Sequence, residues 1–117
     1  MPEGWRTLCR VGDLPEGESR GFDAPPGGFS GLFAIRKGEA IHVYVNSCPH
    51  VGVPLELVPN RFLDRKGEMI VCAAHGARFR IADGECVSGP CIGDLLEAVP
   101  VRIEADEVLV PEEAGLT

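Results

Sequence analysis

Apolar and β-branched residues occur along this chain in short runs that turn-forming residues separate. Over residues 5–11 they alternate with other side chains, and this period of two predicts a strand with one buried face. Residues 32–35 and 40–45 are rich in strand-forming side chains, and the polar stretch 36–39 between them predicts a hairpin. Residues 12–28 are rich in Gly, Pro, Asp and Glu, a composition typical of a loop.

The second half of the chain repeats this design. The expected strands there are residues 61–64, 69–72, 78–81, 98–103 and 108–110. An Asp-Gly pair at 83–84 marks a turn, and Pro100 is expected at the edge or the start of a strand. Only residues 93–97 suggest a helical turn, and residues 112–117 are expected to form a frayed tail.

Many short strands with regular turns predict an all-β fold, either a sandwich or a small barrel of antiparallel strands. Gly and Pro together account for 25 of the 117 residues, so turns are frequent and long helices are not expected. We find no internal repeat and no linker, and we therefore expect a single domain over residues 1–117.

The charge balance limits the class of partner. Eleven basic and 18 acidic residues give a net charge of −7, which argues against nucleic acid or an anionic membrane as the ligand. The same charge is compatible with docking to a basic protein surface, or with solubility alone. We see no secretory leader and no apolar run long enough to cross a bilayer, so the expected location is the cytoplasm.

Two short segments carry the residues that could perform chemistry. Cys48-Pro49-His50 follows the apolar run 40–45, and Cys72-Ala73-Ala74-His75 follows the run 69–72. Each segment therefore places one thiolate donor and one imidazole donor in an expected turn after a strand. Loops that follow adjacent strands can converge at one end of a β domain, which would bring two sulfurs and two nitrogens together. Five cysteines are an odd number, which fits metal binding better than a closed disulfide framework.

Two kinds of metal centre are compatible with these donors. One tetrahedral Zn²⁺ could take two Cys and two His, although zinc sites usually pair like with like, as C-x₂₋₄-C and H-x₃₋₅-H. Here each loop carries one of each, which suits a two-iron cluster in which one iron takes both thiolates and the other takes both imidazoles. This replacement of two Cys by two His defines the Rieske [2Fe–2S] centre.

At these residues the sequence resembles the Rieske family. The pattern C-x-H, a spacer, and C-x-x-H is matched, with a glycine just after each motif at Gly52 and Gly76. Leu55 and Phe79 also match, and are expected in the core below the cluster. The run 83–90 resembles the Gly-Pro loop that covers the cluster in this family. The resemblance implies a Rieske-like fold with one [2Fe–2S] cluster in a subdomain of about residues 46–92.

The resemblance also assigns roles to individual residues. Cys48, His50, Cys72 and His75 would be the cluster ligands. Gly52 and Gly76 are expected to adopt positive φ and to let backbone N–H groups approach the cluster sulfurs. Gly89 and Pro90 would form a lid that limits access of water. Outside the motifs, we expect His42 at the surface, Cys9 as a buried inert thiol, and Cys86 and Cys91 as free thiols.

Within the family the chain is most similar to soluble Rieske-type ferredoxins. Rieske proteins of cytochrome bc complexes carry a disulfide where this chain has Val53 and Ala74, and a serine where it has Ala77. Both differences imply a potential nearer about −150 mV than about +300 mV. Such ferredoxins pass one electron from a flavin-dependent reductase to the terminal oxygenase of a ring-hydroxylating dioxygenase.

The resemblance therefore implies an electron carrier, monomeric and without enzymatic activity of its own. A Rieske oxygenase also needs a mononuclear iron site with His and carboxylate ligands, and beyond the cluster motifs the chain has only His42. Two alternatives remain open. The first is a Rieske-like small subunit of a larger oxidoreductase such as a nitrite reductase, and the second is a structural zinc-binding interaction module.

Overall fold

Antiparallel strands account for nearly all regular structure in the computed structural model, which describes residues 4–24, 31–49, 54–56, 58–73 and 76–114. The strands are β1 (Trp5–Arg10), β2 (Ser19–Phe22), β3 (Leu32–Lys37), β4 (Ala40–Val45), β5 (Met69–Val71), β6 (Arg78–Arg80), β7 (Cys86–Ser88), β8 (Ala98–Val99), β9 (Arg102–Glu104) and β10 (Glu107–Pro111). Within the described residues the helical structure is limited to the 3₁₀ turn η1 (Val11–Asp13). The all-β prediction is confirmed.

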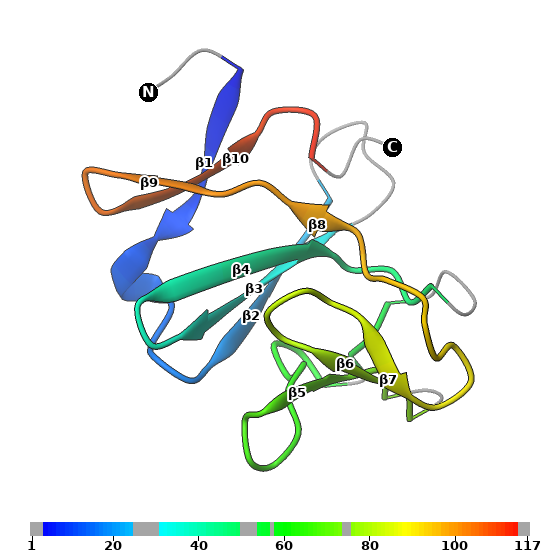
Figure 1. Cartoon of the computed structure of the whole chain (residues 1–117). Helices are drawn as coiled ribbons and strands as arrows, with labels where there is room; N and C mark the ends of the chain where they lie inside the picture. Colours follow the sequence, from blue (N-terminus) through cyan, green and yellow to red (C-terminus); the bar gives the residue numbers. More distant parts are fainter. Residues whose placement is uncertain (1–3, 25–30, 50–53, 57, 74–75, 115–117) are drawn as a thin grey trace.

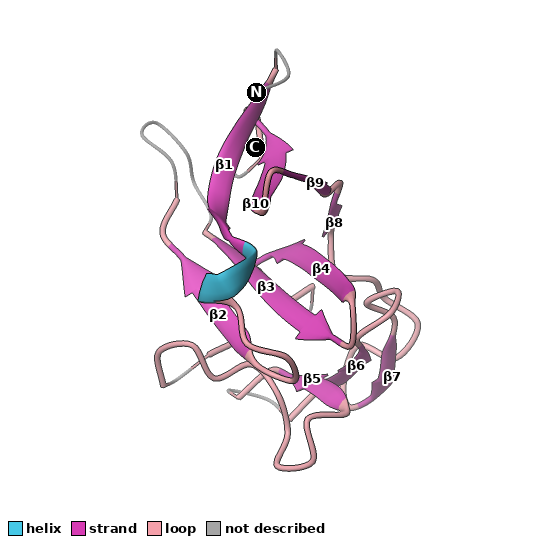
Figure 2. Ribbon diagram, turned by 90° about the vertical axis from the view of Figure 1, so that its left-hand side faces the viewer, coloured by secondary structure: helices cyan, strands magenta, loops and turns pink. Residues whose placement is uncertain are grey.

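The strands form three sheets stacked in tiers (Figures 1 and 2). The upper sheet has the order β1-β10-β9, and the middle sheet has the order β2-β3-β4-β8. The lower sheet, β5-β6-β7, is built from three-residue strands, and Cys72 follows the end of β5 directly. The chain enters the lower tier from β4 and returns to the middle sheet at β8.

Strand β3 separates two apolar cores. Its residues Leu32 and Ala34 pack with Val43, Val45 and Val110, between the upper and middle sheets. Phe33 and Ile35 point to the opposite face of the same strand, toward the lower tier. Because both faces of the strand are buried, all four residues are apolar, and the run shows no alternation.

The lower core surrounds the candidate site. Phe33 stacks on Phe62 with ring centroids 4.3 Å apart, and the Tyr44 hydroxyl donates a 2.6 Å hydrogen bond to the Ile81 carbonyl. Leu55 and Phe79 are fully buried in this core, as expected from the sequence. Cys48 and Cys72 belong to the same core, so the cysteines of the two motifs lie within one apolar cluster.

Several strand predictions are confirmed. The hairpin over residues 32–45 forms as β3 and β4, joined by a tight turn in which Gly38 has a φ of +63°. Residues 5–10 form β1, whose Cys9 is buried. The turn expected after residues 98–103 and before 108–110 also forms, with positive φ at Ala105 and Asp106.

Four expectations were wrong in part. The expected loop 12–28 contains β2, which pairs through its backbone with β3 at the edge of the middle sheet. Residues 61–64 form only an isolated bridge between Leu63 and Ile70. Residues 93–97 form no helical turn, because Leu95 bridges Glu85 instead. The run 98–103 divides at Pro100, which has no N–H to donate, so β8 and β9 belong to different sheets.

The C-terminal tail is only partly described, and the described residues contain no membrane-spanning helix. Of the tail at 112–117, residues 112–114 form a turn and the remainder lies outside the described residues. Among the described residues, no helix is long and apolar enough to cross a membrane.

Candidate metal centre

Cys48 and Cys72 each follow the end of a strand, in the middle sheet and in the lower sheet respectively. Cys48 follows β4 by three residues and Cys72 follows β5 directly. Both are fully buried and belong to the lower core. Burial of two thiols in one apolar cluster provides sulfur donors in a site from which water is excluded. The predicted ligands His50 and His75 lie outside the described residues, as does Gly52.

A network centred on Asn46 holds the first loop closed. The Leu55 N–H donates to Asn46 Oδ1 at 2.9 Å, and Asn46 Nδ2 donates to Glu56 Oε1 at 2.6 Å. The Asn46 N–H donates to the Gly31 carbonyl at 2.9 Å. One amide side chain therefore joins the start of the loop, two residues before Cys48, to its end. Neither Asn46 nor Glu56 was predicted from the sequence.

One backbone hydrogen bond ties the first loop to the second. The Ala73 N–H, one residue beyond Cys72, donates to the Leu55 carbonyl at 2.8 Å. Because Leu55 is itself bound to Asn46, the two Cys-bearing segments form one continuous hydrogen-bonded unit. The expected convergence of the two loops therefore has a direct structural basis in their described parts.

The second loop is a tight turn closed across its base. The Cys72 N–H donates to the Ala77 carbonyl at 2.9 Å, and the Gly76 N–H donates to the Cys72 carbonyl at 2.8 Å. Gly76 has a φ of +73°, as expected for this position. A positive φ of this size favours glycine and reverses the chain immediately after the predicted ligand His75.

The segment carrying Gly89 and Pro90 lies directly on this turn. A Cβ atom on Gly89 would come within 2.7 Å of the Ala77 Cα and 3.2 Å of its Cβ, so only glycine permits the contact. Gly89 has a φ of +100°, and Pro90 is exposed. The segment therefore packs against residue 77, and the lid role of Gly89 and Pro90 stays a prediction.

The remaining cysteines lie in two environments. Cys9 is buried on β1, and burial raises the pKa of its thiol. Cys86 and Cys91 are free thiols with their sulfurs 3.1 Å apart. Burial, followed by the hydrogen bond to Cys86, raises the pKa of Cys91 to about 12, and the charge of Cys48 contributes further. Cys86 and Cys91 belong to the same apolar core as Cys48 and Cys72.

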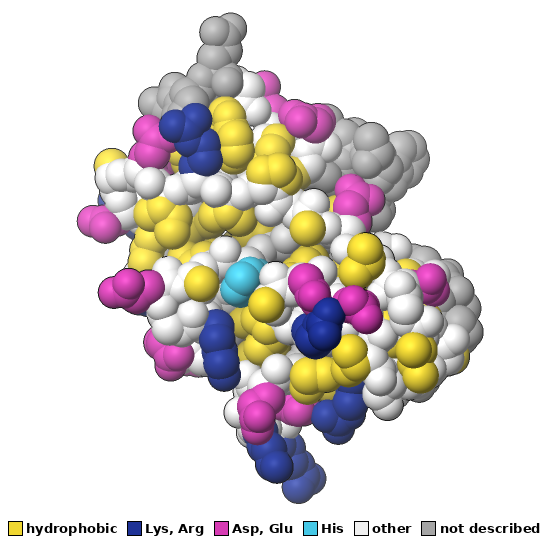
Figure 3. All heavy atoms as spheres, in the orientation of Figure 1, with side chains coloured by type: hydrophobic (Ala, Val, Ile, Leu, Met, Phe, Trp, Pro, Cys, Tyr) yellow, Lys and Arg dark blue, Asp and Glu magenta, His cyan; other side chains and the backbone are white. Residues whose placement is uncertain are grey.

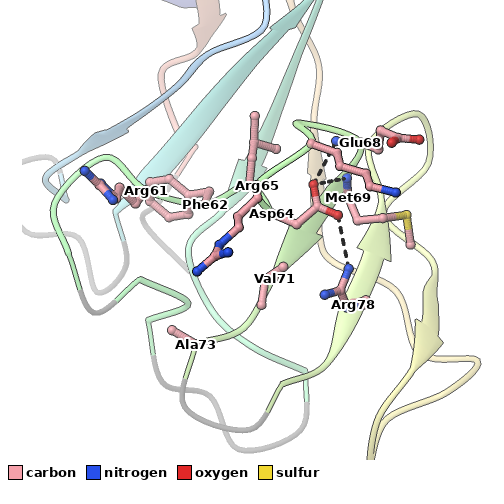
Figure 4. A pocket seen from close by; sticks show the side chains of 11 residues that line it. Arg61, Phe62, Asp64, Arg65, Glu68, Met69, Val71, Ala73 and Arg78 are labelled. Atoms are coloured by element: carbon pink, nitrogen blue, oxygen red, sulfur yellow. Dashed lines mark hydrogen bonds and ion pairs between the residues drawn. The ribbon is translucent and has the colours of Figure 1, made fainter.

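A groove with an excess of basic side chains runs beside the second loop (Figure 4). It encloses about 720 Å³ and reaches Ala73, which lies between Cys72 and the predicted ligand His75 in sequence. Four basic side chains line it together with Asp64 and Glu68, namely Arg61, Arg65, Lys66 and Arg78. The charge beside the second loop therefore has the opposite sign to the net charge of the chain.

Asp64 organises the wall of this groove. Its carboxylate accepts hydrogen bonds from the backbone N–H groups of Glu68 at 2.9 Å and Met69 at 3.4 Å, and from Arg78 at 3.1 Å (Figure 4). The hydrogen bond from Glu68 is the largest of the contributions that lower the pKa of Asp64. The turn before β5 is therefore stabilised by an ionised carboxylate that is 12% exposed.

The described donors fit an iron–sulfur cluster. Two buried cysteines in a closed hydrogen-bonded unit are suited to hold one iron, and the Rieske pattern assigns the second iron to the two histidines. No group of three or more His, Cys, Asp or Glu side chains with metal-binding geometry occurs among the described residues. The four-ligand set therefore stays a prediction that extends beyond those residues.

Comparison with known sequences identifies similar proteins. The chain matches the Rieske [2Fe–2S] domain family over residues 4–102. It is 27% identical over 110 residues to the ferredoxin component of biphenyl 2,3-dioxygenase from Rhodococcus jostii (strain RHA1), an alignment that covers 94% of each chain.

Solved structures show the same fold. The ferredoxin of carbazole 1,9a-dioxygenase from Nocardioides aromaticivorans IC177 superposes with a TM-score of 0.73 at 21% identity, over 93% of this chain and 98% of that one. A chain in a complex of reduced oxygenase and oxidised ferredoxin in carbazole 1,9a-dioxygenase gives a TM-score of 0.74 at 24% identity, with 94% of both chains covered.

Proposed function

Because the chain belongs to the Rieske [2Fe–2S] domain family, we propose that it is a one-electron carrier that works as the ferredoxin component of a dioxygenase system. It would receive electrons from a flavin-dependent reductase and deliver them to a terminal oxygenase. The observation that carries the proposal is the hydrogen bond from Ala73 to Leu55, which joins the segments of the two buried cysteines. The similar biphenyl dioxygenase ferredoxin, which matches over nearly its whole length, supports the same role.

Cys48 and Cys72 would hold one iron of the cluster, and His50 and His75 the other. When bound, the cluster supplies one-electron chemistry at a potential that its ligands, hydrogen bonds and solvent exposure set. The protein contributes a fixed donor set and a water-poor environment. Ala77, fully buried below Gly89, offers no hydroxyl donor at the position between the second loop and the lid. This environment favours the low end of the Rieske range.

The role as a carrier rather than an enzyme implies docking to protein partners near the cluster. Apolar side chains are exposed on the segment around the lid, at Val87, Ile92 and Leu95, with exposed fractions of 39%, 69% and 60%. Exposed apolar side chains that share one segment can contribute to a protein interface when they form a patch. These side chains lie on the segment that contacts the second loop through Gly89. A partner bound there would therefore lie close to the predicted cluster, which shortens the distance that an electron must cross between the two proteins.

Charge would orient the partners. The net charge of −7 predicts attraction to a basic protein, whereas the groove beside Ala73 has a local excess of basic side chains. Figure 3 shows several Lys and Arg side chains at the lower end of the molecule, next to acidic ones, and both signs of charge interspersed over the remainder of this face. A carrier with two partners can use faces of opposite charge for them. The cytoplasmic location and the monomeric state stay predictions.

The decisive experiment is reconstitution with iron and sulfide followed by electron paramagnetic resonance of the reduced protein. We expect a Rieske-type spectrum from the wild type, and its loss in His50→Ala and in His75→Ala, because neither variant retains two imidazole ligands. His42→Ala is the matched control, since His42 lies on β4, outside both motifs, and should give the wild-type spectrum.

Three results would contradict the proposal. A colourless protein that binds zinc in a one-to-one ratio would support the zinc module. A wild-type spectrum in His50→Ala or His75→Ala would refute the ligand assignment. Obligate copurification with a large catalytic subunit would support a role as the small subunit of a larger oxidoreductase.

A further inference from the structure

Cys86 and Cys91 form a pair of thiols that the metal centre does not use. Their sulfur atoms are 3.1 Å apart, and the two residues are 0% and 4% exposed. The sulfur atoms of a disulfide lie about 2.05 Å apart, so a bond between these two requires an approach of only about 1 Å. Both residues belong to the segment that carries Gly89 and Pro90.

Backbone hydrogen bonds bring the two cysteines together. The Cys86 N–H donates to the Asp94 carbonyl at 2.8 Å, and the Gly93 N–H donates to the Cys86 carbonyl at 3.0 Å. The Asp94 N–H donates in turn to the Cys91 carbonyl at 2.9 Å. These bonds fold residues 86–94 into a compact loop in which residue 91 returns to residue 86. The contact between the sulfurs is therefore a consequence of the loop fold.

From this geometry we infer that Cys86 and Cys91 are a site of reversible disulfide formation, with a low-molecular-weight disulfide such as glutathione disulfide as the oxidant. One protein thiolate attacks a sulfur of glutathione disulfide, breaks its S–S bond and releases one glutathione thiolate. The second protein thiolate then attacks the mixed disulfide and releases the second glutathione. The protons of the two protein thiols pass to the two glutathione thiolates, so two thiols are oxidised and one disulfide is reduced.

The position of the pair determines how it reacts. Both sulfurs are buried, but residues 87–90 and 92 around them are exposed, so the pair lies just below the surface of the loop. Glutathione disulfide reaches it only when this turn opens. Gly89 and Gly93, with φ of +100° and +92°, flank the Cys91 position on both sides. We therefore expect the two thiols to be oxidised slowly, at a rate that is limited by opening of this turn.

The disulfide would fix the lid over the cluster, a consequence that rests on the proposed function. Gly89 lies inside the ring that the disulfide closes, and it contacts Ala77 in the turn of the second loop. A cross-link from 86 to 91 restrains the backbone on both sides of that contact. The oxidised form should therefore release iron to a chelator more slowly than the dithiol form.

The test uses the iron-loaded full chain, equilibrated anaerobically in buffers of increasing ratio of glutathione disulfide to glutathione. Samples are quenched in acid, alkylated and digested with trypsin. Both cysteines fall on the peptide 81–102, so mass spectrometry reads the bond directly. We expect this peptide to lose two alkylation sites together as the ratio rises. The Cys9 peptide is the internal control, because Cys9 is also buried but lies on β1, outside the core that contains the other four cysteines, and should stay alkylated throughout.

Two variants and one second readout complete the test. Cys86→Ala and Cys91→Ala should each abolish the intrapeptide bond and any dependence of iron release on the glutathione ratio. Full alkylation of the wild-type peptide at every ratio would overturn the inference, and a disulfide that leaves the rate of iron release unchanged would overturn its role at the lid. Failure of the proposed function is distinguishable, because it appears as a missing cluster spectrum whatever the state of these thiols.

Discussion

Gly89 offers a sharp test of whether residues 89 and 90 form the predicted lid on the second loop. Its φ of +100° is a conformation that residues with a Cβ rarely adopt, and an added Cβ would meet the Ala77 Cα at 2.7 Å. The atom in the way belongs to the backbone, so no side-chain rotation relieves the clash. Gly89→Ala must therefore either strain the turn or lift the lid from Ala77.

The magnitude follows from comparison with a second glycine in the same loop. Gly93 has a φ of +92°, but no atom lies within 4 Å of an added Cβ. Gly93→Ala should therefore lower the free energy of unfolding by the backbone strain alone, about 1–2 kcal/mol. Gly89→Ala adds overpacking against Ala77, which contributes about a further 1–3 kcal/mol. The difference between the two variants isolates the contact between lid and loop.

The assay has two parts. Urea denaturation followed by circular dichroism gives the free energies of unfolding, and the rate of iron loss to a chelator reports the lid. We expect Gly89→Ala to be less stable than Gly93→Ala and to lose iron faster, with Gly93→Ala close to the wild type in the second measurement. Equal destabilisation together with equal rates of iron loss would refute the assignment of residues 89 and 90 as a lid.

Two more predictions concern the potential and the pH dependence. Ala77→Ser places a hydroxyl between the second loop and the lid, and a donated hydrogen bond that favours the reduced cluster by about 1 kcal/mol would raise the midpoint potential by about 40 mV. Potentiometric titration measures it, and an unchanged potential in a variant with an intact cluster would contradict the tuning argument. Asp64 has a pKa below its unfolded value, so its contribution to stability is present in full above about pH 4 and is lost as the pH falls through the native pKa. Unfolding measured between pH 6 and pH 3 should therefore be less pH-dependent in Asp64→Asn than in the wild type, and identical profiles would exclude this role.

The sequence was informative where the pattern is local. The hairpin of β3 and β4 was predictable because its strands contact each other directly and the turn residues between them are polar. Cys48 and Cys72 were identifiable as candidates because thiolate and imidazole donors at fixed short spacings are a chemical pattern that needs no tertiary information. The same holds for Gly76, whose place after the motif predicts the reversal of the chain.

The sequence was uninformative where the contact is distant. Strand β2 contains Ser, Arg and Gly, and it exists because its backbone pairs with β3 while Gly21 faces the Phe62 ring, 41 residues away. Asn46 looks like an ordinary turn residue, and its role appears only when residues 55 and 56 return to it. Residues 98–103 divide between two sheets because β8 pairs with β4 whereas β9 pairs with β10. The hydrophobic pattern of the run contains no information about these partners.

Because β3 packs into a core on each of its faces, the stability of the fold depends strongly on its pairing register with β4. Sliding the strand by a single position would exchange Phe33 and Ile35 with Leu32 and Ala34. The Phe33 ring would then face the upper core, and the lower core would lose its stack on Phe62. Neither core could repack independently of the other. An insertion or deletion within this strand should therefore be far more damaging than one of equal length in the turn at residues 38–39.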